Sequence, residues 1–170
     1  MLLIITACIS VGQGVPNVSI RDTTERLQDY LKTIYWAIDE TPFTDILFCD
    51  NSNYDLDTVN EVCLLHEYSV SKGKKLECYH FQGDSKEVER RGKGYGEGEI
   101  ISWLYDNCLT MRKYAYYYKI TGRLTIHNVR QVYLPENTFI FDVGSECVDT
   151  STAVCKYLNT FSSHLYQNMS

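Results

Sequence analysis

The sequence lacks a long apolar segment and any concentration of positive charge. No apolar run approaches the roughly 18 residues that cross a bilayer, so we expect no integral membrane segment and at most a peripheral membrane contact. The 16 lysines and arginines are outnumbered by 22 aspartates and glutamates, and the net charge of −6 is spread along the chain. Because no broad basic face would attract a polyanion, nucleic acid is not expected as a partner.

Cysteine pairs with metal-binding spacing are also missing. Seven cysteines are an odd number, lie far apart and form no C-x-x-C pair, which argues against a zinc site and a disulfide framework. Most of them occur in apolar runs, where cysteine behaves as a small hydrophobic residue. A reducing cytoplasm is therefore the expected location. The seven are Cys8, Cys49, Cys63, Cys78, Cys108, Cys147 and Cys155.

Several signature motifs are absent as well. The chain has neither G-x-x-x-x-G-K-[ST] nor G-x-G-x-x-G, the two common phosphate-binding loops. It has no G-x-S-x-G, and its four histidines show no mutual spacing typical of metal ligands. A serine hydrolase is thus a weak hypothesis, and no cofactor is predicted.

What is present suits one α/β domain. With 170 residues, 44% of them hydrophobic, the chain can bury one sizeable core, and we expect a single domain over residues 1–170. The opening "MLLIITACISVGQG" has no positive segment before its short apolar run, so it predicts a buried strand, Leu2 to Val11, in place of a leader peptide. Further strands are predicted within 44–55, 75–81, 114–121, 137–143 and 152–158, and helices over 21–40, 56–74 and 97–113.

This alternation predicts a mostly parallel twisted sheet with helices on both faces, a Rossmann-like α/β fold. Asp22 or Thr23 is expected to cap the first helix, and Asp57 the second, which Gly73 would end. In such sheets ligands bind outside the carboxyl ends of the strands. The polar strand ends are therefore the candidate site, namely Thr6 to Ser10, Asp50 to Asn53, Gln82 to Asp84 and Lys119 to Arg123.

The segment "QGDSKEVERRGKGYG", residues 82–96, is predicted to be a long polar loop that leads into the third helix. Its glycines and its cations Arg90, Arg91 and Lys93 are compatible with anion binding at a helix start. Glu97 and Glu99, expected in the first turn, would instead satisfy the helix dipole and repel phosphate. A ligand loop and a flexible loop before an acid-capped helix remain equal alternatives.

Two shorter patterns carry charge. In "DLD", Asp55 and Asp57 have the spacing of paired metal ligands, but a turn residue and a helix cap explain them better. In "KITGR", Gly122 separates Lys119 from Arg123 at the end of a predicted central strand. A glycine there lets a ligand approach the backbone, and the two cations suit phosphate oxygens; a simple turn with two solvated cations is the less favoured alternative.

Three segments in this order, "ILFCDNSNYD", "GKGYGEGEII" and "YYYKITGRL", resemble a family of bacterial glycosyltransferase-like proteins. These proteins are found in lipopolysaccharide and capsule gene clusters and have the nucleotide-diphospho-sugar transferase fold of the GT-A type. The resemblance covers Leu2 to about Thr152. It implies transfer of a sugar from a nucleotide-diphospho-sugar donor to a surface-polysaccharide or lipid-linked glycan acceptor.

The resemblance also implies roles for particular residues. The ends of the first two strands would face the nucleoside, and the segment from Lys93 to Glu97 would lie beside the donor. Better-known members of the fold carry an acidic D-x-D and its metal where this chain has Lys119 to Arg123, which would replace them. The implied nucleotide-binding residues are Thr6, Ala7, Asp50, Asn51, Lys93, Gly94, Gly96, Lys119, Gly122 and Arg123.

A metal-independent transferase of this kind would need a carboxylate as base if it inverts configuration, and Glu97, Asp142 and Asp149 remain open as candidates. Domains of this fold usually exceed 200 residues, so this chain is expected to lack part of the acceptor region. The alternative function is a non-catalytic remnant of the same fold that binds a nucleotide or a partner.

Overall fold

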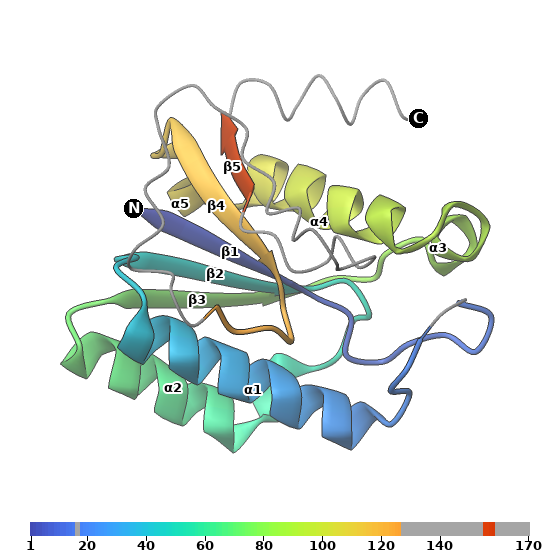
Figure 1. The fold of residues 1–170 in the computed structure, drawn as a ribbon, viewed down its shortest axis with the longest axis horizontal. Coiled ribbons are helices and arrows are strands. Elements are labelled where there is room, and N and C mark those ends of the chain that lie inside the picture. The colour runs from blue at the N-terminus through green and yellow to red at the C-terminus, as the bar shows by residue number, and fades with distance from the viewer. Residues whose placement is uncertain (16–17, 127–154, 159–170) are drawn as a thin grey trace.

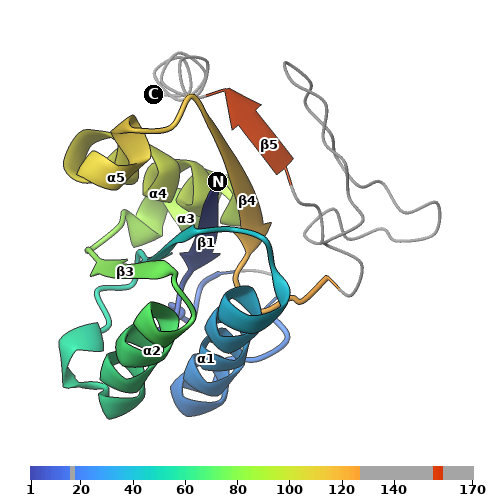
Figure 2. The same ribbon diagram turned by 90° about the vertical axis from the view of Figure 1, so that its left-hand side faces the viewer.

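The computed structural model describes residues 1–15, 18–126 and 155–158, which form three layers. A twisted sheet is covered by α1 and α2 on one face and by α4 and α5 on the other (Figures 1 and 2). The strands are β1 Leu2–Ala7, β2 Asp45–Asp50, β3 Lys75–His80, β4 Tyr116–Thr121 and β5 Cys155–Leu158. The helices are α1 Thr23–Glu40, the 3₁₀ turn η1 Leu56–Thr58, α2 Asn60–Ser71, α3 Ser85–Arg91, α4 Lys93–Asn107 and α5 Leu109–Arg112.

The strand order is β3-β2-β1-β4-β5, with β1 to β4 parallel and β5 antiparallel to β4. The predicted α/β fold with a mostly parallel sheet is therefore confirmed. From β1 the chain moves outward through β2 to β3, and then crosses back to place β4 on the other side of β1. In open α/β sheets such a switch point is where ligands bind, outside the carboxyl ends of the strands.

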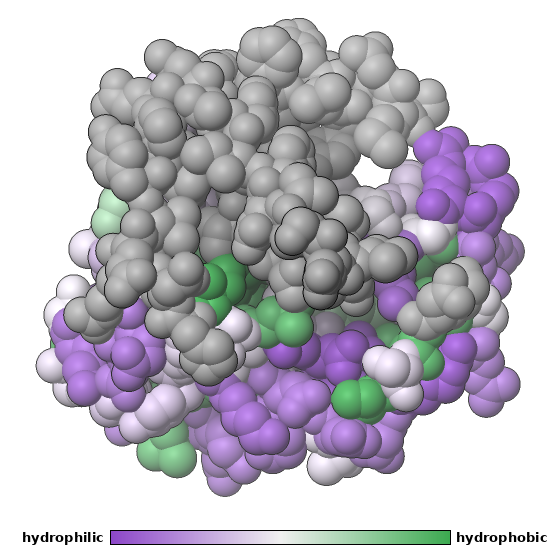
Figure 3. All heavy atoms as spheres, in the orientation of Figure 1, coloured by the Kyte–Doolittle hydropathy of each residue, from purple (hydrophilic) through white to green (hydrophobic). Residues whose placement is uncertain are grey.

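Alternation along the central strands builds one core on each face of the sheet. Leu3 and Ile5 of β1 are fully buried against the α1 and α2 side, while Leu2 and Ile4 are fully buried against the α4 and α5 side. A strand buried on both faces is apolar throughout, which is why "LLII" shows no polar alternation. In Figure 3, hydrophilic residues cover most of the visible surface in the region of α1 and α2.

The first helix matches its prediction closely. Asp22 caps α1 through its side chain, which accepts a hydrogen bond of 2.8 Å from the Glu25 backbone N–H. Tyr30, Ile34 and Ile38 are buried at helical spacing on the side that faces the sheet. Replacing such a cap typically costs about 1 kcal/mol. The predicted end of the second helical segment is also confirmed, because Gly73 has a φ of +69° just after α2.

Several sequence predictions about the helices and strands are wrong, and the predicted helix over 97–113 is divided into α4 and α5. Residues 82–96 are not a loop, because Asp84 caps α3, and α4 starts at Lys93 after Gly92 with its φ of +88°. Asp57 does not cap α2, whose N-cap position is Val59; Asp55 instead caps η1. The first strand ends at Ala7 instead of Val11, since the backbone N–H of Ile9 donates to the side chain of Asp50 in place of a backbone carbonyl of the neighbouring strand.

The sequence did not predict that α4 begins before Glu97, because the glycines in this segment lower helix propensity. Gly96 and Gly98 are buried where α4 packs closely on the sheet. A Cβ atom at Gly96 would lie only 3.0 Å from the Asn51 side-chain nitrogen. Gly96 therefore permits close packing inside a helix and does not indicate a flexible segment.

The predicted strand within 152–158 is confirmed by β5, whereas the predicted strand at 137–143 lies outside the described residues. Among the helices that the structure describes, none has the length and apolar character that a membrane crossing requires. The cysteines at positions 8, 49, 63, 78 and 108 are free thiols.

Candidate functional site

The candidate site is the carboxyl edge of the parallel strands. Register places Thr6 of β1 beside Cys49 of β2 and beside Thr121 of β4, so these strands end at a common level. The amino end of α4 lies at this edge (Figure 1). Polar groups from three strand ends and one helix therefore meet here.

Lys119 and Thr121 both point from β4 toward α4, where they bind Glu97. The ammonium group of Lys119 forms an ion pair with Glu97 Oε2, and the Thr121 hydroxyl donates to Glu97 Oε1 at 3.0 Å. The Lys119 side chain is only 10% exposed. Its charge is thus neutralised inside the protein, and burying an unpaired ammonium would have been costly.

Asn51 and Glu99 form a second polar contact between the sheet and α4. The Asn51 amide nitrogen donates to the Gly96 carbonyl at 3.3 Å and to Glu99 Oε2 at 3.4 Å. Glu99 Oε1 also accepts the backbone N–H of Asp84 at 2.8 Å. Glu99 therefore joins the strand end of β2, the segment after β3 and α4. The sequence pattern predicts Glu99 only in the first turn of a helix and gives no signal of this role.

Asp50 is fully buried and serves the protein's own backbone. Its carboxylate accepts the N–H groups of Ile9 at 2.7 Å, Ser52 at 3.0 Å and Tyr54 at 3.0 Å. Burial raises the pKa of this carboxyl above its ordinary value, although the hydrogen bonds from Ile9, Tyr54 and Ser52 oppose that shift. Asp50 thus connects the loops that follow β1 and β2, and both of its carboxylate oxygens already accept hydrogen bonds from the protein.

Thr6 and Ala7 are likewise engaged in the sheet edge. The Thr6 carbonyl accepts the backbone N–H of Gly122 at 3.0 Å, and the Ala7 carbonyl accepts that of Asn51 at 3.1 Å. Both residues are almost fully buried. They shape the edge through their backbones and lie beneath its surface.

Gly122 is required by packing. A Cβ atom there would lie 2.4 Å from the Thr6 carbonyl oxygen and 2.7 Å from the Tyr30 ring, distances that real side chains do not show. The close approach that the sequence suggested for a ligand is therefore made by the protein itself.

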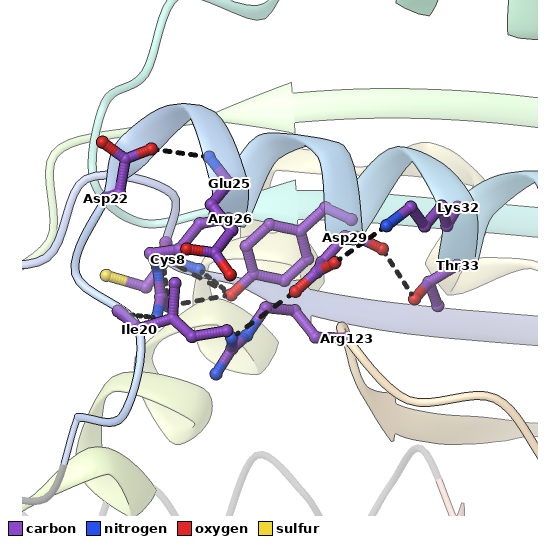
Figure 4. Close-up of polar contacts among 10 residues, drawn as sticks. Cys8, Ile20, Asp22, Glu25, Arg26, Asp29, Lys32, Thr33 and Arg123 are labelled. Atoms are coloured by element: carbon purple, nitrogen blue, oxygen red, sulfur yellow. Dashed lines mark hydrogen bonds and ion pairs between the residues drawn. The ribbon is translucent and has the colours of Figure 1, made fainter.

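Arg123 leaves the end of β4 toward α1, on the face opposite Glu97. Its guanidinium lies 3.8 Å from the Asp29 carboxylate (Figure 4). Arg26, which sequence analysis did not single out, is buried nearby and donates to the carbonyl oxygens of Cys8 at 2.9 Å and Ile20 at 2.9 Å. Lys119 and Arg123 therefore do not converge on one point, although the sequence placed both beside a diphosphate.

The amino end of α4 is exposed at this edge. No side chain of the described residues caps the helix, and its first turn contains no acidic residue. The expectation that Glu97 and Glu99 occupy the first turn is wrong, because α4 begins four residues before Glu97. Lys93 is the first helical residue and is exposed, and a Cβ atom at Gly94 would meet nothing within 4 Å.

Arg90 and Arg91, just before α4, contact side chains close to them in the sequence. Arg90 and Arg91 form ion pairs with Glu87 at 2.6 Å and 2.7 Å, and the Arg91 guanidinium lies over the Tyr95 ring, 5.3 Å from its centre. The positive end of the helix dipole is therefore reinforced by basic side chains around it. Such an end has the chemistry to bind a phosphate or carboxylate group.

Of the three predicted candidate bases, Glu97 lies at this edge, while Asp142 and Asp149 lie outside the described residues. Comparison of the chain with protein-family models, with curated proteins and with solved structures gives no match.

Proposed function

We propose that this protein binds a nucleotide-activated sugar at the carboxyl edge of its sheet and transfers the sugar to a surface-polysaccharide or lipid-linked glycan acceptor in the cytoplasm. The observation that carries the proposal is the amino end of α4, which has no acid in its first turn and no side-chain cap from the part of the chain that the structure describes. A diphosphate fits there because backbone N–H groups and the helix dipole favour an anion. The position agrees with the ligand-binding edge of α/β sheets.

The strand-end residues then have roles different from those the sequence suggested. Lys119 positions Glu97 by pairing with it, and Glu99 and Asn51 fix α4 against the sheet. Glu97, the candidate base that lies at this edge, accepts the proton from an acceptor hydroxyl. The basic end of α4, including Lys93, takes the place of a metal beside the departing diphosphate.

A non-catalytic nucleotide-binding module is the second candidate. It is favoured by the pairing of both strand-end cations with carboxylates, Lys119 with Glu97 and Arg123 with Asp29. These pairs reduce the positive charge that would otherwise stabilise a departing nucleoside diphosphate. Binding without turnover would be the result.

Isothermal titration with the diphosphates of uridine, guanosine, cytidine and thymidine, and with their sugar derivatives, tests the binding step. Titrations with EDTA show whether a metal ion contributes. At least one of these nucleotides should bind and should still bind with EDTA present. If none binds, the proposal and its alternative as a nucleotide-binding module are both wrong.

The α4 position is tested by Gly94→Glu, which places a carboxylate in the open first turn. We expect at least about tenfold weaker binding, because the added charge repels the diphosphate and satisfies the helix dipole. Gly94→Gln is the matched control, since it has the same shape without the charge and should bind almost normally. Equal binding by the two variants would rule out this location.

Turnover separates the two candidate functions. Release of free nucleoside diphosphate from the sugar donor that binds, and its loss in Glu97→Gln, would support a transferase. Binding with no release in the presence of glycan acceptors would support the non-catalytic module.

A further inference from the structure

Three side chains that can bind a metal ion meet at the carboxyl ends of β2 and β3. They belong to Asp55, Asp57 and His80, and one ligand atom from each lies within 4.8 Å of the other two. The His80 Nε2 atom is 3.9 Å from Asp57 Oδ2. The third ligand, His80, ends β3 and cannot be assigned to the two aspartates from the sequence pattern.

Local structure fixes the two aspartates on either side of one buried residue. Leu56 between them is only 2% exposed and packs in the core on the α1 and α2 side. Asp55 Oδ1 accepts the backbone N–H of Asp57 at 3.2 Å, which leaves the other oxygen of that carboxylate for a ligand. The 3₁₀ turn thus presents both carboxylates outward from a fixed backbone.

His80 is directed to the same place by strand alternation. Leu76 and Cys78 of β3 pack on the α1 and α2 side, so His80, two residues further along, faces that side too. Its Nδ1 atom is buried and has no hydrogen-bond partner among the described residues. The ring nitrogen that faces the aspartates is Nε2, 3.9 Å from Asp57 Oδ2, so Nε2 is the atom that would bind an ion.

We propose that Asp55, Asp57 and His80 bind a divalent first-row transition-metal ion, with water filling the remaining coordination positions. Two carboxylates would balance the charge of such an ion, and an imidazole beside them favours Mn²⁺, Fe²⁺ or Zn²⁺ over Mg²⁺ and Ca²⁺, which prefer oxygen ligands alone. The Asp57 side chain is 93% exposed, so it can turn toward an ion without disturbing the core.

This metal site does not depend on the proposed nucleotide site. His80 faces α1 and α2, whereas Glu97 and Lys119 meet on the α4 side of the sheet. The two sites can therefore be tested separately.

Titration with Mn²⁺, followed by the electron paramagnetic resonance signal of the free ion, is the direct test. Mn²⁺ is a better probe than Zn²⁺ because thiolates such as that of the exposed Cys63 bind zinc but are poor ligands for manganese. We expect about one bound Mn²⁺ per chain. Absence of binding by the wild-type protein would overturn the proposal.

Asp57→Asn, Asp55→Asn and His80→Ala should each weaken Mn²⁺ binding by at least about tenfold. Asn retains the capping ability of Asp55, and Asp57 is so exposed that its replacement should not disturb folding; circular dichroism without metal checks this. Asp106→Asn, in an exposed residue of α4, is the control and should bind normally. Equal Mn²⁺ binding by all four variants would show that the ion binds elsewhere and would also overturn the proposal.

Discussion

Lys119 and Arg123 lie four positions apart at the end of β4 and form ion pairs on opposite faces of the sheet. Lys119 pairs with Glu97 of α4, whereas Arg123 lies 3.8 Å from Asp29 of α1. Each cation thus links the central sheet to a different helix. The short sequence "KITGR" therefore connects all three layers of the fold.

The Lys119–Glu97 pair should stabilise the protein as a unit. Lys119→Met leaves the Glu97 carboxylate without its cation, and Glu97→Gln leaves a nearly buried ammonium without its anion. We expect each change to lower the free energy of unfolding by about 2 kcal/mol, less than for a fully buried pair because Glu97 is partly exposed.

A double-mutant cycle in urea measures this coupling. The double variant should lose clearly less than the sum of the two single losses. Lys32→Met is the control, since Lys32 is 74% exposed in its pair with Asp29 and should contribute less than about 0.5 kcal/mol. Strict additivity of the Lys119 and Glu97 effects would show that the pair contributes nothing.

Gly122→Ala should destabilise the protein because the new methyl group overlaps the Thr6 carbonyl and the Tyr30 ring. Relieving that overlap requires a shift of β1 or α1, and we expect a loss of about 1 to 3 kcal/mol. Gly94→Ala is the matched control, since its methyl group meets no atom within 4 Å and should leave stability unchanged or slightly higher. The melting temperatures of both variants test this. A melting temperature of Gly122→Ala equal to that of the wild type would contradict the packing role of Gly122.

Asp50→Asn should be strongly destabilising even though the two side chains have nearly the same shape. The carboxylate accepts three backbone N–H groups, and an amide would turn an NH₂ group toward some of them. We expect the free energy of unfolding to fall by about 2 to 4 kcal/mol. Chemical denaturation measures the loss, and a loss below that of an exposed substitution such as Asp22→Asn would contradict the anchoring role.

Glu77 should make stability depend on pH in the acid range. Burial alone would raise its pKa, but hydrogen bonds from Lys75, Thr110 and Tyr79 outweigh burial and lower the pKa of Glu77 to about 2. Because this value is below the pKa of about 4.3 expected in the unfolded chain, Glu77 stabilises the folded state above that pH, and the contribution disappears as the pH falls toward about 2.

Denaturation of the wild type and of Glu77→Gln between pH 7 and pH 2 tests this dependence. The difference in stability between the two proteins should be about 2 kcal/mol at neutral pH and should shrink below about pH 5. Glu67→Gln, in an exposed residue of α2, should show no such trend. A constant difference for Glu77→Gln across the range would mean that its carboxylate is not stabilised by these partners.

The sequence predicted the elements whose signals are local. The parallel strands are continuous apolar runs, and α1 combines a helical apolar pattern with the Asp22 cap. The beginning of α4 was missed because its glycines signal flexibility locally, whereas their reason is close packing against Asn51, 45 residues away. Local propensity cannot report a contact of that kind.

The sequence predicted where the candidate site lies but not which contacts its residues make. Polar residues after parallel strands pointed to the carboxyl edge, which follows from topology alone. Which groups remain open there depends on partners far along the chain, such as Glu97, 22 residues before Lys119, or Asp50, 41 residues after Ile9. The same dependence explains why His80 could not be assigned to Asp55 and Asp57 from spacing.

Glu97 and Glu99 attach α4 to the sheet at two separate points, one on β4 and one at the ends of β2 and β3. A helix held at two points near its amino end resists both rotation about its axis and tilting away from the strands. A molecule that docks on that end would therefore meet N–H groups already in place, and little of its interaction energy would be lost to ordering the helix.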